Sequence, residues 1–321
     1  FLAPLALASY KHIGMSRLLQ SYIDGIPLDL AHSLLPLRTR LKPSMQMHIH
    51  LHARFQGKFA GDTHAKTRRP ASFSRTAFRG LIDSLESSVR GLRWRPGRSQ
   101  WVDYYEDDSY SPKAFEHKVE LVTGFLQDAD PGTVWDLGSN TGYFSRIASD
   151  QGIQTLAFDQ DPASVEQNYH TSVSREETTL LPLVIDLASP SPKIGWANAE
   201  RMDLVERGPA EMLFALALIH HLAIAGNVPL GMIAEFFSKL CKWAIVEFIP
   251  KDDPKVVSLL ASREDIFLTY TQAEFEHEFK RYFEIKSVHQ IIDSKRSLYL
   301  MCTKPGGVEH TREASGLPTI R

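Results

Sequence analysis

Cysteine is scarce in this chain of 321 residues, in which Cys241 and Cys302 are the only two. Both lie in or beside apolar stretches, so we expect no disulfide framework and a reduced, intracellular protein in the cytoplasm. With 43% apolar residues, the chain has enough material for a core that needs no cross-links.

Long apolar runs are also missing. Met212–Gly226 is interrupted by two histidines, and no run reaches the length of a membrane span, so no membrane association is predicted. Leu2–Ala8 lacks the preceding basic segment and the following cleavage site of a secretion signal. There is no zinc-finger spacing, no nucleic-acid module and no internal repeat.

The near-neutral net charge of −2 hides a division along the chain. Residues 1–100 hold 16 Lys and Arg against 5 Asp and Glu, a net of +11, which leaves 20 against 33, a net of −13, for the remainder. Such asymmetry predicts either an anionic partner for the N-terminal part or attraction between the two parts.

The N-terminal part is expected to be mainly helical. Residues 1–40 have helical character with a break at residues 25–27, Gly-Ile-Pro. Residues 45–52, Met-Gln-Met-His-Ile-His-Leu-His, alternate like a strand, which would place His48, His50 and His52 on one face. The outer pair would then be about 13 Å apart, too far for one ion, so we predict a polar face and no metal site.

A basic segment follows and is predicted to be helical from Ser74 to Trp94. Four of its arginines are candidates for a cationic helix face: Arg75, Arg79, Arg90 and Arg93. Such a face is either solvated or holds a phosphate backbone or an anionic glycan.

The most informative segment is 134–146, Val-Trp-Asp-Leu-Gly-Ser-Asn-Thr-Gly-Tyr-Phe-Ser-Arg. An apolar stretch ends at Asp136, Gly138 and Gly142 bracket a tight turn, and an apolar stripe at helical spacing begins at Phe144. This order predicts a strand, a glycine loop and a helix, in which the backbone passes close to a nucleotide-like ligand. An ordinary glycine turn after a buried strand is the alternative.

The glycine spacing differs from the Gly-x-Gly-x-x-Gly of dinucleotide-binding proteins. Dehydrogenases hold a diphosphate at this turn, and the carboxylate of Asp136 would repel it. A cationic ligand without phosphate is favoured, such as S-adenosylmethionine with its sulfonium and ammonium groups. The segment resembles the first motif of class I S-adenosylmethionine-dependent methyltransferases, which usually have a glycine in place of Asn140. Asparagine tolerates a left-handed backbone better than most residues.

Alternating strands and helices after this loop predict a parallel sheet covered on both faces. Further strands are expected at residues 154–159, 180–186, 211–217, 243–248, 285–292 and 297–303, the last two as a hairpin. Helix caps are predicted at Ser111, Asp161, Asp253 and Thr271. The resemblance implies an α/β fold: a Rossmann-like seven-stranded methyltransferase sheet with a mainly helical N-terminal domain.

The same interpretation divides the chain into three parts. We expect a basic helical domain at residues 1–100, an S-adenosylmethionine-binding methyltransferase domain at 101–303 and a disordered tail at 304–321. The chain also resembles a bacterial family of methyltransferases. The resemblance lies in four segments: residues 23–30, the His-Ile-His-Leu-His run, the glycine loop and the Leu-Ile-His-His-Leu run at 218–222. Some members of that family are described as nodulation-related.

Acidic residues end the first three expected strands, where open α/β sheets bind their ligands. Asp159 offers two carboxylate oxygens to the two ribose hydroxyls of a nucleoside. The resemblance implies that Asp186 and the backbone near Leu187 bind the adenine edge and that Gln160 lies against the ring. The implied cofactor site also contains Asp136 and the loop residues Gly138, Ser139, Asn140 and Gly142, although any one carboxylate has a helix cap or solvated strand end as its alternative.

The end of the fourth strand faces the transferable methyl group in this fold. Methyl transfer to oxygen or nitrogen needs an aligned nucleophile that loses a proton, and histidine titrates in the right range to accept it. His220 and His221 are therefore candidates for a general base or a substrate-orienting group, with a helix cap and a core hydrogen bond as the alternatives. Glu247 ends the fifth strand and is a second candidate, unless it pairs with Lys251 or Arg201.

An aromatic and acidic segment precedes the helix that begins near Ser111. Such a segment commonly folds over the cofactor in this superfamily, so Tyr104, Tyr105 and Tyr110 are candidates to cover it. A packing linker is the alternative.

The leading hypothesis is an S-adenosylmethionine-dependent methyltransferase that acts on an oxygen or nitrogen of a small molecule or glycan. An RNA methyltransferase that uses the basic N-terminal part is a second hypothesis. The fourth strand lacks the Asn/Asp-Pro-Pro-aromatic motif that holds a planar base amine, which argues against methylation of nucleobase amino groups. A domain that binds the cofactor without catalysis is the third hypothesis.

Overall fold

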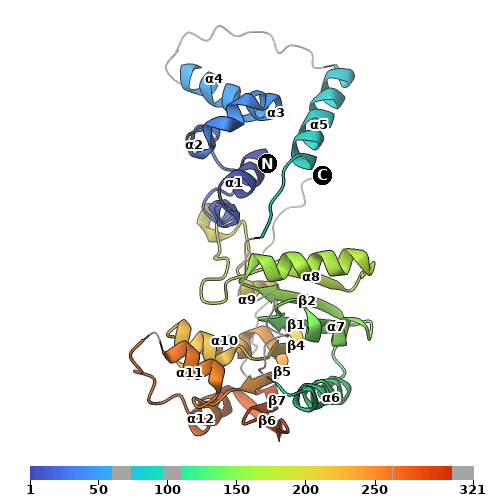
Figure 1. Cartoon of the computed structure of the whole chain (residues 1–321), viewed down its shortest axis with the longest axis vertical. Coiled ribbons are helices and arrows are strands. Elements are labelled where there is room, and N and C mark those ends of the chain that lie inside the picture. The colour runs from blue at the N-terminus through green and yellow to red at the C-terminus, as the bar shows by residue number, and fades with distance from the viewer. Residues whose placement is uncertain (60–73, 97–109, 262, 306–321) are drawn as a thin grey trace. The chain divides into compact units, whose positions relative to one another are not determined.

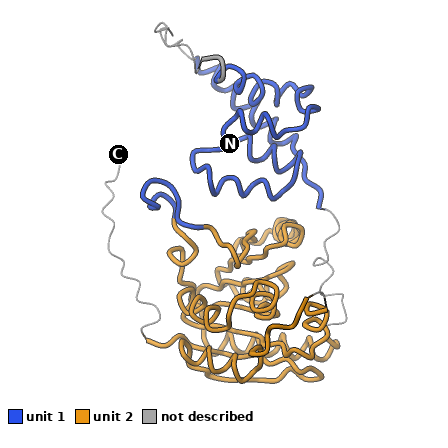
Figure 2. Tube along the Cα trace, turned by 90° about the vertical axis from the view of Figure 1, so that its left-hand side faces the viewer, with its two compact units in different colours: residues 1–96, 192–201 blue, residues 97–191, 202–321 orange. Residues whose placement is uncertain are grey.

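The computed structural model describes residues 1–59, 74–96, 110–261 and 263–305. The chain forms two compact units, residues 1–96 with 192–201 and residues 97–191 with 202–321, which Figure 2 shows in two colours. Most of the predicted disordered tail, from residue 306 on, lies outside the described residues. No helix among the described residues has both the length and the apolar composition that crossing a bilayer requires.

The first unit is built of short helices, as the sequence predicts for residues 1–40. A small apolar core joins α1, α2 and η3, and the partly buried Leu85 and Val89 of α5 pack against it. Helix α5 ends at Arg90, so Arg93 lies beyond the helix, where its guanidinium donates to the carbonyl of Leu92 at 2.8 Å. The elements are α1 (Leu2–Tyr10), η1 (Ile13–Gln20), α2 (Leu28–Leu34), η2 (Leu37–Leu41), α3 (Pro43–Met45), η3 (Gln46–Leu51), α4 (His52–Phe59), α5 (Arg75–Arg90) and η4 (Trp196–Asn198).

The predicted strand at residues 45–52 is wrong, because this segment is helical. Met45, Ile49 and Ala53 are buried and recur every four residues, so a helix brings all three to the core. A strand would have grouped Ile49 with Met47, which is 54% exposed. The short apolar pattern is compatible with the two-residue period of a strand and with the spacing of a helix, and packing against the core stabilises the helix.

The helical conformation also separates the three histidines. The Nε2 of His48 lies 2.8 Å from the Oγ of Ser84 on α5, whereas His52 is exposed. His50 is fully buried, with its Nδ1 2.7 Å from the Nδ1 of His32 and its Nε2 2.9 Å from the Oγ1 of Thr39. The three side chains therefore have different surroundings and share no polar face.

The second unit contains a seven-stranded sheet with the order β3-β2-β1-β4-β5-β7-β6. Its strands are β1 (Thr133–Leu137), β2 (Gln154–Asp159), β3 (Leu180–Val184), β4 (Ala210–Ala215), β5 (Cys241–Phe248), β6 (Phe283–Gln290) and β7 (Ser297–Thr303). Neighbouring strands from β3 to β5 are parallel, and β7 is antiparallel to both β5 and β6. The predicted sheet and its closing hairpin are confirmed, with strand ends that differ by a few residues.

Helices cover both faces of this sheet (Figure 1). They are α6 (Pro112–Ala129), α7 (Tyr143–Ser149), α8 (Pro162–Ser174), α9 (Leu204–Arg207), η5 (His221–Ala225), α10 (Leu230–Leu240), α11 (Pro254–Leu260) and α12 (Gln272–Tyr282). Along β4, Met212 and Phe214 pack with α6 and α7, whereas Leu213 and Ala215 pack with α10 and α12. This alternation confirms that β4 is buried on both faces.

The predicted caps of four helices are confirmed. Ser111, Asp161, Asp253 and Thr271 each accept a hydrogen bond from a backbone N–H in the first turn of α6, α8, α11 and α12. A side-chain oxygen satisfies an N–H that the helix itself leaves without a partner, which explains why these helices begin where they do.

Candidate active site

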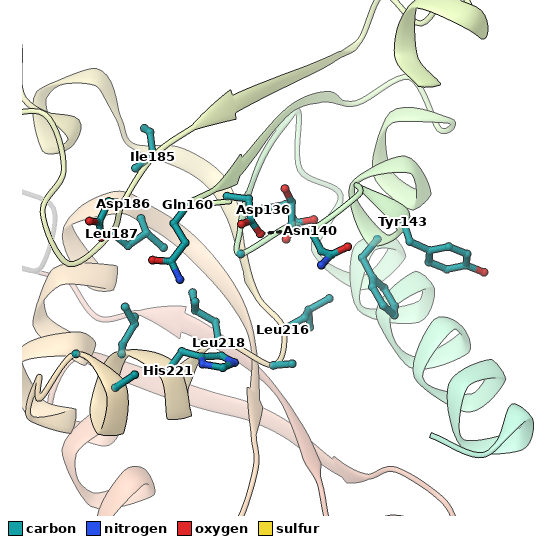
Figure 3. A pocket seen from close by; sticks show the side chains of 18 of the residues that line it. Asp136, Asn140, Tyr143, Gln160, Ile185, Asp186, Leu187, Leu216, Leu218 and His221 are labelled. Carbon is teal, nitrogen blue, oxygen red and sulfur yellow. Dashed lines mark hydrogen bonds between the residues drawn. The ribbon is translucent and has the colours of Figure 1, made fainter. Parts of the chain in front are cut away.

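A cavity of about 710 Å³ opens at the carboxyl ends of β1 to β4. The strand order changes direction between β1 and β4, which is where open α/β sheets form a crevice. In Figure 3, Gln160, Asp186 and Leu187 lie on one side of Asp136, and Tyr143 lies on the other. The described lining also includes residues from the β1 loop, the end of β2, the segment after β3, the segment after β4 and α6: Gly138, Ser139, Asn140, Asp159, Ile185, Leu216, Leu218, His221, Phe115 and Lys118.

The glycine loop has the backbone that its sequence predicts. Gly138 and Gly142 have φ of 76° and 82°, and Asn140 between them has φ of 52°. A Cβ on Gly142 would lie 2.4 Å from the side chain of Asn168, and one on Gly138 would lie 3.1 Å from Leu218. Both positions therefore favour glycine, for conformation and for space. Gly138 lines the cavity, whereas Gly142 precedes α7 and is not among the lining residues.

Asp136 lines the cavity and is only 2% exposed. Its Oδ2 accepts a hydrogen bond of 2.6 Å from the hydroxyl of Ser145. Burial raises the pKa of Asp136 to about 7, and the Ser145 hydrogen bond opposes that rise. The carboxylate is therefore poised to ionise fully when a cation is placed beside it.

Asp159 lines the cavity at the end of β2. Its two oxygens accept hydrogen bonds of 2.8 Å from the backbone N–H groups of Asn140 and Asp161, and a carboxylate offers about four acceptor positions in all. Burial raises the pKa of Asp159, while the backbone hydrogen bonds oppose the rise. The hydroxyl of Ser139 is buried without a hydrogen-bond partner among the described residues, which marks a polar position that a ligand could satisfy.

The segment after β3 supplies the next part of the lining. Asp186 stands two residues beyond the end of β3, and its Oδ1 accepts a hydrogen bond of 3.1 Å from the N–H of Ala188. Leu187 and Gln160 also line the cavity. All three predicted adenine-side residues therefore gather on one side of Asp136 (Figure 3).

The two histidines after β4 have different surroundings. His221 lines the cavity, and burial lowers its pKa to about 4, so the imidazole is neutral at pH 7. His220 is 1% exposed and is not among the lining residues, and its ring centre lies 4.1 Å from that of His221. Neither ring nitrogen of His220 has a hydrogen-bond partner within the described ranges. Of the pair, His221 is the one that can meet a substrate.

Glu247 does not line the cavity and is fully buried behind it. Its partners are Lys118 and Arg296 rather than the expected Lys251 or Arg201, and Lys251 instead binds Asp265 at 2.7 Å.

Of the three tyrosines expected over the cofactor, Tyr110 is among the lining residues of the cavity. Its hydroxyl donates a hydrogen bond to the carboxylate of Glu247. Tyr104 and Tyr105 lie outside the described residues.

Lys118 is a charged lining residue that the sequence interpretation missed. It lies on α6, is buried, and its Nζ donates to Glu247 at 2.7 Å. A signal was present, since Lys118 falls between Ala114 and Val122 at the four-residue spacing of the buried face of α6. A lysine on an apolar helix face is rarely left without a charged partner or a ligand.

Comparison with known proteins finds a relative by sequence. The chain is 34% identical over 303 residues to nodulation protein NoeA of Rhizobium meliloti (strain 1021), and the match covers 93% of this chain and 63% of that relative. The chain thus spans less than two thirds of the relative's length. No protein-family model matches the chain.

The sheet order with an antiparallel β7, and the glycine loop that follows β1, decide the fold. The chain has the class I methyltransferase fold. Similar solved structures include the PH0226 protein of Pyrococcus horikoshii OT3, at 16% identity over 65% of this chain and 100% of that one with a TM-score of 0.44. Magnesium protoporphyrin IX methyltransferase (ChlM) from Synechocystis PCC 6803 is 13% identical over 72% of this chain and 96% of that one, with a TM-score of 0.42.

Proposed function

We propose that this chain transfers a methyl group from S-adenosylmethionine to an oxygen or nitrogen of a small molecule or glycan. The observation that carries the proposal is the acidic cavity over the glycine loop, lined by Asp136, Asp159 and Asp186. Three carboxylates favour a cationic nucleoside and disfavour a diphosphate, whose negative charges they would repel. The chain is also 34% identical to nodulation protein NoeA, whose name states no reaction.

The cavity residues fit this cofactor in three places. Asp159 has acceptor capacity for ribose hydroxyls, and Asp186 with the backbone near Leu187 would hold the adenine edge. Asp136 and Lys118 both line the cavity and interact electrostatically, and their opposite charges suit the ammonium and carboxylate groups of the methionine part. When bound, S-adenosylmethionine supplies an electrophilic methyl group on a sulfonium.

The protein's own contribution is to orient the acceptor and to keep water away from it. Burial lowers the pKa of His221 to about 4, so the imidazole is neutral at pH 7 and can accept a hydrogen bond from the hydroxyl or amine of the acceptor. The same low pKa makes His221 a weak base, so its main role is to orient the acceptor. The apolar side chains of Leu216, Leu218 and Leu222 also line the cavity and would exclude water from the reacting groups. No other histidine lines the cavity within the described part of the chain.

The proposal is tested by calorimetry against S-adenosylhomocysteine, followed by transfer of a labelled methyl group to small-molecule and glycan fractions. Binding together with a labelled product is expected. Binding without transfer to any fraction would instead favour the domain that binds the cofactor without catalysis. Transfer that survives replacement of both His220 and His221 would make the two histidines structural.

A further inference from the structure

The carboxylate of Glu247 uses both of its oxygens inside the protein. Oε2 accepts hydrogen bonds of 2.7 Å from the Nζ of Lys118 and 2.8 Å from the backbone N–H of Ala217. Oε1 accepts from the hydroxyl of Tyr110 and lies 3.9 Å from the Nη1 of Arg296. Because Glu247 is fully buried and does not line the cavity, its carboxylate does not meet an acceptor directly.

The bond to Ala217 acts on a strained part of the cavity wall. Ala217 follows β4 with φ of 50°, a left-handed conformation that alanine seldom adopts. Glu247 holds the N–H of this residue in place, and the next residue, Leu218, lies against Gly138 of the glycine loop. The same segment continues to His221. The positions of the Leu218 and His221 side chains therefore depend on the backbone conformation at Ala217, which the hydrogen bond to Glu247 stabilises.

Glu247 also balances the charge behind the cavity. Arg296 is 1% exposed and makes a two-pronged ion pair with Asp253, at 2.7 Å from Nε and 3.0 Å from Nη2. Lys118 and Arg296 thus face the carboxylates of Glu247 and Asp253 in one buried group. These four residues come from α6, the position before β7, β5 and the cap of α11, respectively. Burial alone would raise the pKa of Glu247, but Lys118 and Arg296 outweigh it and hold the pKa below its ordinary value. Without Glu247, Lys118 would carry an unbalanced charge at the cavity wall.

We propose that Glu247 is a positioning residue, which fixes the segment after β4 through Ala217 and fixes Lys118 on the cavity wall. Through these two contacts it sets the places of Leu218, His221 and Lys118 relative to the glycine loop. This assignment replaces the predicted catalytic role of Glu247, and its link to methyl transfer rests on the proposed function.

The test compares Glu247→Gln with Glu235→Gln in the full chain. Glutamine removes the charge and leaves one acceptor oxygen for three donors, Lys118, Tyr110 and Ala217, so the bond to the Ala217 N–H is weakened. Glu235 is an exposed partner of Lys239 and serves as the matched control. In Glu247→Gln, amide hydrogen exchange is expected to quicken by about tenfold or more in residues 216–222 while the sheet strands keep their protection. The dissociation constant for S-adenosylhomocysteine is expected to rise by about tenfold, because the misplaced wall no longer fits the ligand. Glu235→Gln should change neither quantity.

Exchange at residues 216–222 that matches the wild type would overturn the proposal. So would a loss of methyl transfer with unchanged exchange and unchanged binding, since that result indicates a catalytic base. If Glu247→Gln does not fold, Glu247→Asp keeps the charge but shortens the side chain, and a smaller increase in exchange confined to the same segment is expected. Exchange can be measured even if S-adenosylhomocysteine does not bind, so failure of the proposed function remains distinguishable from failure of this proposal.

Discussion

Among single residues, His221 is the one whose loss should separate chemistry from cofactor binding. It is neutral at pH 7 and lines the cavity, so it can accept a hydrogen bond from the nucleophile and align it with the methyl group. We predict that His221→Gln lowers the rate of methyl transfer by about 10² to 10³ with little change in S-adenosylhomocysteine affinity. His170→Gln, which replaces an exposed histidine beside Glu166 on α8, is the control. Transfer at the wild-type rate in His221→Gln would rule out a catalytic role.

The raised pKa of Asp136 leads to a prediction of how cofactor affinity depends on pH. Its pKa in the free protein is about 7, and an ammonium group bound beside it favours the ionised form and lowers that pKa. Below pH 7 binding must therefore release a proton, so affinity should fall by up to about tenfold per pH unit on acidification and level off above about pH 8.

Calorimetry with S-adenosylhomocysteine from about pH 5.5 to about pH 8.5 spans this dependence. The Asp136→Asn variant has no proton to release at this position, so its affinity should be weaker and should vary less with pH. A wild-type affinity that stays constant across the range would show that Asp136 does not meet the ammonium group.

At the scale of elements, the stability that the glycine loop gains from glycine can be measured by comparing two glycines with the same left-handed backbone. One of them has no room for a Cβ, and the other has open space around it. Gly142 and Gly152 have φ of 82° and 84°, but a Cβ on Gly142 meets Asn168, whereas a Cβ on Gly152 meets nothing within 4 Å. Gly152→Ala should cost about 1 to 2 kcal/mol through backbone strain alone. Gly142→Ala should cost about 1 to 3 kcal/mol more, because overpacking is added. Urea unfolding measures both, and equal losses would show that the close approach to Asn168 has no energetic consequence.

The elements that could be predicted are those with a local signal. The loop of Gly138, Asn140 and Gly142 was recognisable because its special backbone needs particular residues within a few positions. The strands of the sheet were recognisable from apolar runs, and four helix starts from their caps. The prediction for residues 45–52 was wrong because a short alternation fits both periods, and only the core formed with distant helices decides between them.

The buried charged residues Lys118, Glu247, Asp253 and Arg296 show why the rest of the site could not be predicted. Lys118 and Glu247 are 129 positions apart, and no local pattern links a buried lysine on α6 to a carboxylate on β5. Glu247 was correctly expected at a strand end, but which way its side chain faces depends on the cations that the fold brings to it. Lys118 was missed for the same reason.

At the scale of the whole molecule, the charge division bears on the class of acceptor. The net positive charge lies in positions 1–100, but the described cavity is lined by three carboxylates, and its buried lysine is paired with Glu247. A polyanion such as RNA is therefore a poor fit to the reacting site itself. We predict that the labelled methyl group of an extract assay remains after ribonuclease treatment, and a label removed by ribonuclease would favour the RNA alternative.

The central claim is that the cavity accepts a cationic nucleoside without phosphate and rejects diphosphates. Calorimetry of the full chain against S-adenosylmethionine, S-adenosylhomocysteine, NADH and ATP at one ionic strength tests it most directly. The carboxylates of Asp136, Asp159 and Asp186 predict binding of the first two and none of the others. Tight binding of NADH or ATP, with no binding of S-adenosylmethionine, would contradict the account.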